Sequence, residues 1–287
     1  MSEVSLRHAL MFALFLSVST AAFAAPDIRV VPSSPRPGEV IFVTLCAGKE
    51  LARASCSWHG KSYAFLPYEE AYRVILPVPA GMKVGGLHTT VYWRYADGEC
   101  GKKEIPLEVR PRTFGIQHLK LSAAQEKKYD APETAREYQL IGAALDTVTE
   151  ECYWQGNFLE PVVGRISTAY GLQRYVNGHF YYRHKGVDIA APRGTPVQAA
   201  ADGVVSLADD SFLLHGQTVI VDHGQGVSTL YLHLSQIDVS PGESVKQGQI
   251  IGRVGATGAA TGPHLHYGVY VYHEAVDPFF WRRLPKQ

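Results

Sequence analysis

Residues 262–272 read GPHLHYGVYVY and carry the strongest structural signal in the chain. Val and Tyr are enriched in strands, so the run over 265–272 predicts a β-strand. Side chains two residues apart in a strand project from the same face of a sheet, so we expect His264 and His266 to share one cavity. The alternative is that the two histidines form a chance pair on an open surface. Two other segments of the chain help to decide between these interpretations.

Two further segments bring metal-binding side chains into the same part of the chain. His184 and Asp188 stand four residues apart around Gly186, where a strand running into a turn would bring both side chains to one centre. His233 lies in the alternating run TLYLHL at 229–234, so its side chain is expected to face away from the leucines. A catalytic zinc ion takes three ligands from His, Asp or Glu and leaves a position open for water. The three segments supply such a set with two imidazoles to spare, although a buried structural histidine is the alternative for His233.

The C-terminal part of the chain, from about residue 161, consists of short β-rich runs separated by Gly and Asp-Gly turns. This pattern predicts a domain of antiparallel hairpins without helices. His215 and His223 each precede a glycine in such a turn, so we expect them to cap backbone groups and to play no part in a metal site. The predicted strands cover residues 203–207, 218–222, 228–233, 249–254 and 265–272.

The N-terminal part also consists of short β-rich runs separated by turns, and a helical pattern separates the two parts. Roughly 260 mature residues exceed one typical domain of about 100–150 residues, so two compact units are expected. Residues 25–112 predict an Ig-like β-sandwich with strands at 40–45, 72–76, 88–95 and 102–109. Residues 113–160 predict a helical linker, in which Asp130 caps a helix with Glu133 three residues on. The apolar stripe expected to pack against the protein is Tyr138, Ile141, Leu145 and Val148.

The first 24 residues have the pattern of a secretory signal peptide. Arg7 and His8 precede an uncharged apolar run at 9–18, and small residues end at Ala22-Phe-Ala24. A membrane anchor is the alternative, but the run is shorter than the roughly 20 residues that a spanning helix needs. The pattern predicts an exported protein that begins at Ala25 and has no later membrane span, with the periplasm as the expected compartment and secretion as the alternative.

The four cysteines predict disulfides in an exported chain. An even number of cysteines in an oxidising compartment favours pairing, and their spacing contains no C-x-x-C pair typical of a zinc site. Four cysteines allow three pairings, of which we expect Cys56 with Cys100, leaving Cys46 and Cys152.

The charge balance gives no reason to expect nucleic acid as a partner. The chain has 27 basic and 27 acidic residues, a formal net charge of zero, and no long run of one sign. We expect a monomer, although the sequence leaves the oligomeric state open.

Taken together with their flanks, the histidine segments identify a family resemblance. The stretches GVDIAAPRGTPV, TLYLHL and GATGAATGPHLHYGV occur in the order found in lysostaphin-like, LytM-type zinc metallopeptidases, which are bacterial cell-wall endopeptidases. The resemblance covers roughly residues 160–281 and implies an antiparallel β-domain of the duplicated hybrid motif type at 161–287. By resemblance, one zinc ion per chain would be held by His184, Asp188 and His266, while His233 and His264 would contact the attacking water or the developing oxyanion.

The resemblance also implies a substrate class and a mechanism. It indicates hydrolysis of peptide bonds in peptidoglycan stem peptides or cross-links, with a zinc-activated water and one histidine as base. We expect His264 to be the base and His233 the stabiliser, although the sequence does not separate the two roles. Other hydrolase signatures, H-E-x-x-H and S-x-x-K, do not occur in the chain.

Two other roles remain open from the sequence. A noncatalytic wall-binding or amidase-activating protein on the same fold is the alternative function, although such relatives typically lack zinc ligands. For the peptidase, the role of the N-terminal unit is also open: it would inhibit the enzyme, target it to the wall or bind a partner protein.

Overall fold

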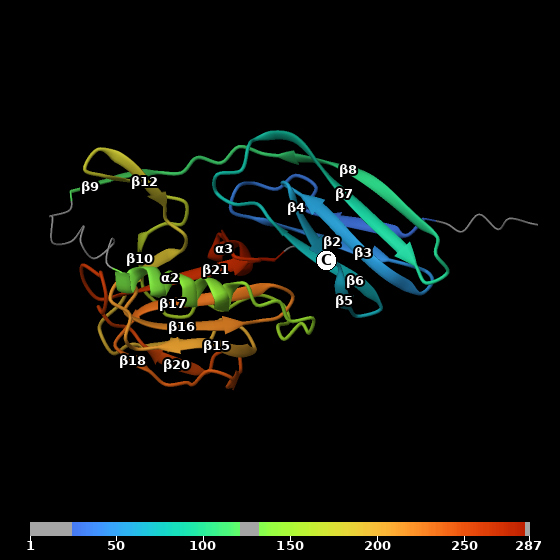
Figure 1. Ribbon diagram of the computed structural model, residues 1–287. Coiled ribbons are helices and arrows are strands. Elements are labelled where there is room, and N and C mark those ends of the chain that lie inside the picture. The colour runs from blue at the N-terminus through green and yellow to red at the C-terminus, as the bar shows by residue number, and fades with distance from the viewer. Residues whose placement is uncertain (1–24, 121–131, 285–287) are drawn as a thin grey trace, which may run out of the picture.

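The computed structural model describes residues 25–120 and 132–284, so the predicted signal peptide at 1–24 and the predicted cap Asp130 lie outside the described residues. Two β-rich units lie side by side, and helix α2 (Pro132–Leu145) covers one side of the C-terminal unit (Figure 1). The regular secondary structure of the described residues is therefore almost entirely β, as the sequence predicts. No helix in the two described ranges has the length and apolar character to cross a membrane.

The N-terminal unit is a sandwich of two four-stranded antiparallel sheets, ordered β1-β2-β6-β5 and β4-β3-β7-β8. Alternate side chains of each sheet point inward, so Ile41 and Val43 of one sheet join Val91 and Trp93 of the other in a common core. The immunoglobulin-like character of this sandwich stays a prediction. Its strands are β1 (Asp27–Val31), β2 (Val40–Cys46), β3 (Leu51–Trp58), β4 (Lys61–Ala64), β5 (Leu66–Tyr68), β6 (Ala71–Pro77), β7 (Gly85–Tyr95) and β8 (Cys100–Val109).

The C-terminal unit is organised around a large antiparallel sheet with the order β10-β13-β21-β17-β16-β15-β19, with β22 added beside β21. Two three-stranded sheets, β14-β20-β18 and β12-β11-β9, flank it. The strands are β9 (Ile116–Leu119), β10 (Arg165–Thr168), β11 (Gln173–Val176), β12 (His179–Arg183), β13 (Val187–Ala190), β14 (Pro196–Gln198), β15 (Gly203–Asp209), β16 (Gln217–Asp222), β17 (Val227–Leu234), β18 (Gln236–Ile237), β19 (Ser244–Val245), β20 (Ile250–Arg253), β21 (His264–Val271) and β22 (Glu274–Val276).

Every run predicted to be a strand is a strand in the structure. The expectation that the C-terminal domain has no helix is wrong, because the short helix α3 (Pro278–Trp281) follows β22. The Asp277 side chain caps it by accepting a hydrogen bond from the Phe279 N–H at 2.9 Å, and Pro278 supplies a pre-set backbone at its first position.

The two inner strands of one sandwich sheet, β2 and β6, are buried on both faces. In β2 and β6, the residues that do not face the sandwich core, Val40, Phe42 and Ile75, belong to the core of the C-terminal unit. The Phe42 ring lies 6.3 Å from that of Trp281, centroid to centroid, in an edge-to-face arrangement. A strand covered on both faces reads as an unbroken apolar run, which is why residues 40–43 read VIFV without alternation. The two units therefore share a core and do not hang on a flexible tether.

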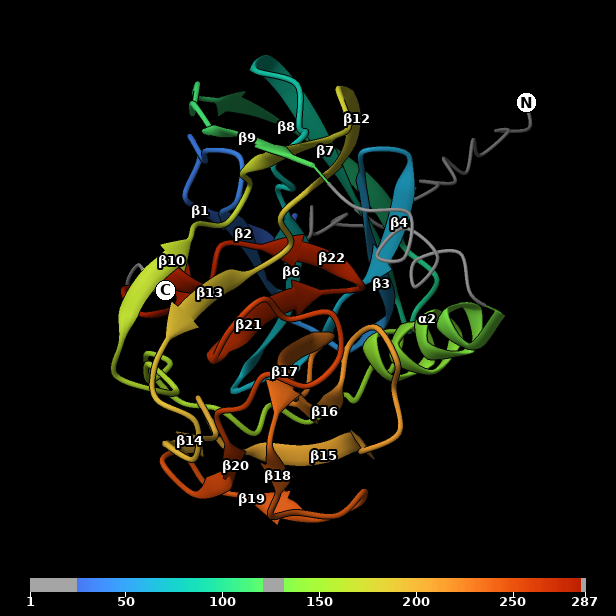
Figure 2. The same ribbon diagram turned by 90° about the vertical axis from the view of Figure 1, so that its left-hand side faces the viewer.

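The segment between the two units packs on the C-terminal unit. Strand β9 adds in parallel to β11. Helix α2 lies against the large sheet (Figures 1 and 2). There Ile141 and Leu145 pack with Ile220. The predicted stripe is only partly right, because Tyr138 is exposed and Val148 lies beyond the end of the helix. The helix uses a narrower apolar face than its sequence spacing predicts.

The predicted disulfide between Cys56 and Cys100 is wrong. Cys56 on β3 lies opposite Val91 and Cys100 on β8 lies opposite Arg94, so strand β7 stands between the two cysteines. Two strand spacings amount to roughly 9.5 Å, beyond the roughly 7 Å Cα limit for a disulfide. Cys56 is also buried whereas Cys100 is exposed, and all four cysteines, including Cys46 and Cys152, are free thiols.

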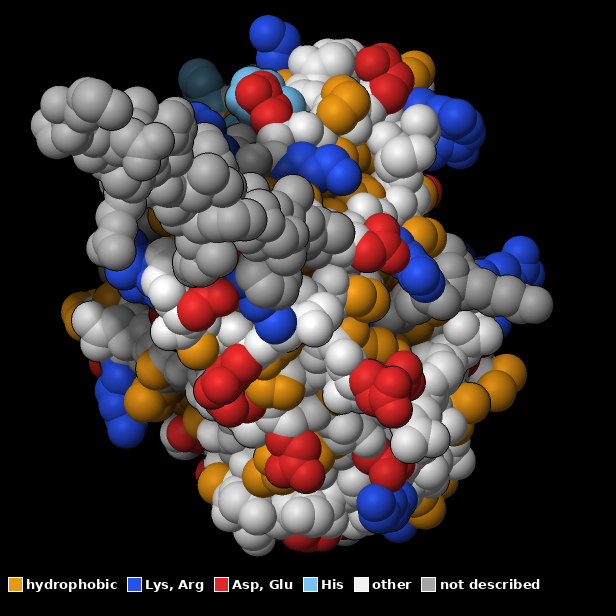
Figure 3. All heavy atoms as spheres, turned by 90° about the vertical axis from the view of Figure 1, so that its right-hand side faces the viewer, with side chains coloured by type: hydrophobic (Ala, Val, Ile, Leu, Met, Phe, Trp, Pro, Cys, Tyr) orange, Lys and Arg blue, Asp and Glu red, His pale blue; other side chains and the backbone are white. Residues whose placement is uncertain are grey.

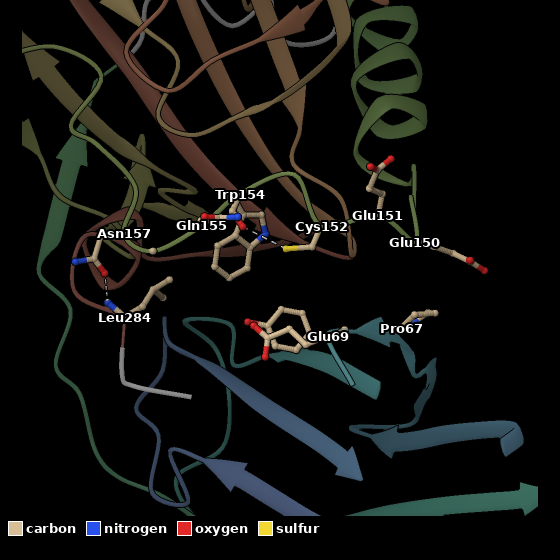
Figure 4. A pocket seen from close by; sticks show the side chains of 11 residues that line it. Pro67, Glu69, Glu150, Glu151, Cys152, Trp154, Gln155, Asn157 and Leu284 are labelled. Atoms are coloured by element: carbon tan, nitrogen blue, oxygen red, sulfur yellow. Dashed lines mark hydrogen bonds between the residues drawn. The ribbon is translucent and has the colours of Figure 1, made fainter. Parts of the chain in front are cut away.

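A pocket of about 1070 Å³ opens where the two units meet (Figure 4). Pro67 and Glu69 of the sandwich line one side, and Glu150 and Trp154 of the following segment line the other. None of the five predicted site residues is among those that line it. The outer surface seen in Figure 3 carries acidic and basic side chains interspersed with hydrophobic ones, as the balanced composition predicts.

Candidate metal centre

Strand register brings the predicted metal ligands together. Strands β13 and β21 are antiparallel neighbours in which Asp188 lies opposite His266 and Ala190 lies opposite His264. Directly opposed residues project from the same face, so the carboxylate meets both histidines of the H-x-H pair. His184 precedes β13, and its backbone N–H donates to Leu172 O at 2.8 Å, which fixes its approach to the same point.

Three side-chain atoms converge at this point. The Asp188 Oδ1 atom lies 2.8 Å from His266 Nδ1 and 3.0 Å from His184 Nε2, and the two ring nitrogens are 3.0 Å apart. All three residues are buried, with exposed fractions of 3% for His184, 7% for Asp188 and 9% for His266. Ligands of a tetrahedral zinc ion bound at about 2.0–2.1 Å stand about 3.3 Å apart, so this donor set fits zinc after a few tenths of an ångström of expansion.

Neighbouring backbone fixes which ring nitrogens face the centre. The His184 Nδ1–H donates to Ala169 O at 3.0 Å, which leaves the Nε2 lone pair for the metal. On the far side of the His266 ring, a Cβ atom at Gly186 would lie 2.8 Å from Nε2 and 2.4 Å from Tyr267 O. Glycine at position 186 is therefore required by space, and it allows the His184 segment to pass this close to β21.

The Asp188 carboxylate stays ionised. Burial by itself raises its pKa, but the favourable interactions with the adjacent His184 and His266 side chains outweigh burial and hold the pKa well below its usual range. Burial also lowers the pKa of His266, despite the opposing effect of Asp188. The site thus presents an anionic oxygen beside neutral imidazole, the protonation states that zinc requires of its ligands.

The other two predicted site residues lie beside the ligands. The His233 and His264 rings are 4.9 Å apart, centroid to centroid, and the His264 Nε2 atom is 3.9 Å from Asp188 Oδ1. The His233 Nδ1–H donates to Thr257 O at 2.9 Å, and the His264 Nδ1–H donates to Gly262 O at 2.8 Å. Each ring therefore keeps its Nε2 atom as a free acceptor in the neutral form.

His233 is held in an unusual backbone conformation. Its φ is 63°, in the left-handed region that few non-glycine residues adopt, and its backbone N–H donates to His215 O at 3.1 Å. Burial, together with the nearby His266 and His264, lowers the pKa of His233 to about 3. The ring is therefore neutral at neutral pH.

The structure brings together all five residues singled out from the sequence, and it adds one that the sequence did not indicate. Arg174 on β11 places a guanidinium nitrogen 3.4 Å from the outer carboxylate oxygen, Oδ2, of Asp188. No local pattern marks it, because its role depends on how a separate hairpin folds over the centre. His215 and His223 lie outside the ligand cluster: His215 pairs with Glu137 at 2.7 Å, and His223 is fully buried.

Comparison with known proteins agrees with this geometry. Residues 182–278, which include the five site residues, match the model of peptidase family M23. The chain is 43% identical over 126 residues to the DD-carboxypeptidase/endopeptidase Mpg of Neisseria meningitidis serogroup B, an alignment that covers 43% of this chain and 29% of that protein. It is 37% identical over 139 residues to the peptidoglycan DD-endopeptidase ShyC of Vibrio cholerae, covering 48% of this chain and 28% of that protein.

A solved structure is similar over most of the chain. A crystal structure described as that of a peptidase M23 from Pseudomonas aeruginosa superposes on 87% of this chain and 96% of its own, with a TM-score of 0.63 and 29% identity. The matched regions of Mpg and ShyC, by contrast, span less than a third of those proteins. The predicted resemblance is confirmed: this chain carries a domain of peptidase family M23, the family of LytM and lysostaphin.

Proposed function

We propose that this protein is an exported zinc metalloendopeptidase that hydrolyses peptide bonds in peptidoglycan. The observation that carries the proposal is the convergence of His184 Nε2, Asp188 Oδ1 and His266 Nδ1 at a buried point beside two further imidazoles. Two imidazoles and one carboxylate form the ligand set of hydrolytic zinc sites that keep one position open. The peptidase names of Mpg and ShyC support the same reaction class.

The proposed mechanism divides the work between the metal ligands and the neighbouring histidines. His184, Asp188 and His266 would hold a zinc ion, which would supply Lewis acidity and make a bound water acidic enough to ionise near neutral pH. His264 Nε2 accepts the proton of the attacking water and passes it to the leaving amine. His233, whose ring lies 4.9 Å from that of His264, would stabilise the developing oxyanion.

We propose stem-peptide cross-links as the substrate and the periplasm as the compartment. The names of the relatives support this choice, since both contain an endopeptidase term and ShyC is described as acting on peptidoglycan. The signal-peptide pattern of residues 1–24 supports export to a compartment that contains peptidoglycan. The noncatalytic wall-binding or amidase-activating role is disfavoured, because a protein without hydrolytic function has no need for the intact ligand set.

Zinc analysis combined with wall hydrolysis tests the proposal. The purified mature chain should hold about one zinc ion and release soluble fragments from purified peptidoglycan, and mass spectrometry of defined muropeptides would identify the bond. His184→Ala should abolish both zinc retention and fragment release. His88→Ala is the matched control, because His88 lies on the sandwich with a side chain that is 66% exposed. Undiminished hydrolysis by the His184→Ala protein would refute the proposal, and zinc binding without any hydrolysis would favour the noncatalytic alternative.

A further inference from the structure

The hairpin β11–β12 presents one of its faces to the metal centre. Arg174 and Tyr182 lie opposite each other across the hairpin, and Gln173 and Arg183 form the neighbouring pair. Neighbouring pairs project from opposite faces of a two-stranded ribbon, so Arg174 and Tyr182 share the face toward Asp188. Arg183 instead reaches the Phe114 ring, with its guanidinium carbon 5.8 Å from the ring centroid.

The Arg174 guanidinium is held at three edges. Its Nη2 atom lies 3.4 Å from Asp188 Oδ2, its Nε–H donates to Gln117 Oε1 at 3.0 Å, and its Nη1 donates to the Tyr182 hydroxyl. The side chain is only 16% exposed. A guanidinium is a rigid planar fork, so three partners in three directions fix both its position and its orientation.

The two oxygens of Asp188 therefore have separate tasks. Oδ1 faces the two ligand histidines, whereas Oδ2 faces Arg174. A carboxylate with one oxygen engaged by a cation is restrained from rotating, and it offers the other oxygen to a metal. The arrangement favours binding of the metal through one oxygen only.

The residue that holds Arg174 comes from a distant part of the chain. Gln117 lies on β9, which follows the sandwich and pairs in parallel with β11, with Arg174 directly opposite Gln117. Both residues precede the segment 182–278 that matches the family model. The connection between the two units thus contributes a side chain to the surroundings of the metal ligands.

We propose that Arg174 is a positioning residue for the metal ligand Asp188, and that Gln117 of the connecting strand holds Arg174 in place. The inference rests on the proposed zinc site. It adds that these two residues hold the ligand Asp188 in the orientation that the metal requires. Strand β9 thereby makes the zinc affinity of the C-terminal unit depend on the segment that precedes it.

Zinc dissociation constants of the mature chain, measured by competition with a chelator at pH 7.5, test this inference. Arg174→Met should weaken zinc binding 10- to 100-fold, the usual range for loss of a partner behind a metal ligand. Arg174→Lys keeps the charge but cannot reach three partners, so we expect a smaller loss. Gln117→Leu should weaken binding less than Arg174→Met. Arg183→Met is the matched control, the same change on the same hairpin but on its other face, and it should alter the constant less than twofold.

The outcomes separate this inference from the proposed function. A wild-type chain that retains no zinc would overturn both. Wild-type affinity in Arg174→Met, tighter binding in that variant, or an equal loss in Arg183→Met would overturn this inference and leave the zinc site standing. The melting temperature of each metal-free variant reports folding, and if Arg174→Met does not fold, Arg174→Lys and Gln117→Leu carry the test.

Discussion

Replacing Phe42 by alanine tests whether the two units share a core. Phe42 lies on β2, in a sheet whose other face forms the sandwich core, yet its own side chain packs into the C-terminal unit. It is 1% exposed and lies edge-to-face with Trp281, and the Arg73 guanidinium carbon is 5.9 Å from its ring centroid. The substitution therefore removes a ring from the boundary between the units.

The magnitude follows from the burial of the ring. Truncating a fully buried phenylalanine costs about 3–5 kcal/mol, from lost transfer free energy and from the cavity left behind. Because β2 belongs to both cores, we expect this loss to lower the free energy of unfolding of the whole described chain. Tyr92→Ala is the control, since Tyr92 is 44% exposed on the outer face of the sandwich and its truncation should cost within about 0.5 kcal/mol.

Denaturant unfolding with two probes measures this coupling. Far-UV circular dichroism reports all strands, and zinc retention reports the C-terminal unit alone. We expect the two transitions to coincide in the wild type and to shift together in Phe42→Ala. Two separate transitions in the wild type, or a sandwich that weakens while zinc retention is unchanged, would refute the shared core.

Three further predictions concern single residues. Gly186→Ala should weaken zinc binding by at least about 10-fold, because the added Cβ would lie 2.4 Å from Tyr267 O and would displace the strand beside His266. Gly81→Ala, at a position with open space, should leave the dissociation constant unchanged, and equal affinities of the two variants would contradict the steric argument. Glu137→Ala should lower the free energy of unfolding by about 3 kcal/mol, since the buried carboxylate accepts hydrogen bonds from the backbone N–H groups of Leu213, Leu214 and His215. Glu133→Ala on the exposed face of the same helix is its control, and similar melting temperatures of the two variants would contradict the prediction. Burial lowers the pKa of His223 to about 4, so protonation favours the unfolded chain, whose histidine has a pKa of about 6.5. The stabilisation due to neutral His223 is complete above pH 6.5 and falls by about 3 kcal/mol as the pH drops to about 4, and His223→Gln should remove this part of the pH dependence of unfolding. An unchanged slope in His223→Gln would show that other groups cause it.

The strands and the metal ligands were predictable because their signals are local. Alternation and Gly turns mark a strand whatever it pairs with, and the spacing of His264 and His266 places both on one face before any partner strand is known. Asp188 joins the cluster only because strand pairing places it opposite His266. The expectation that Asp188 is a ligand came from the resemblance to the LytM family.

The features that the sequence did not predict depend on contacts between distant segments. Arg174 gains its role only because β11 folds over Asp188 and pairs with β9. The run VIFV at 40–43 does contain a signal for a strand buried on both faces, but its second partner lies more than a hundred residues away. The wrong pairing of Cys56 and Cys100 has the same origin, since only the strand order places β7 between them.

The shared core also affects how the role of the N-terminal unit can be studied. A fragment of residues 155–287 lacks β9 and α2 and leaves the partners of Phe42 and Ile75 uncovered. Low activity of such a fragment would reflect a damaged fold, so inhibition by the N-terminal unit is better tested by single substitutions at the boundary in the whole chain.

X-ray absorption at the zinc edge of the mature protein is the most direct measurement of the proposed centre. The arrangement of His184, Asp188 and His266 predicts one zinc ion surrounded only by nitrogen and oxygen, with the multiple-scattering signature of two imidazoles, and loss of one imidazole in His266→Ala. A sulfur-containing coordination shell, or a wild-type zinc spectrum that His266→Ala leaves unchanged, would contradict it.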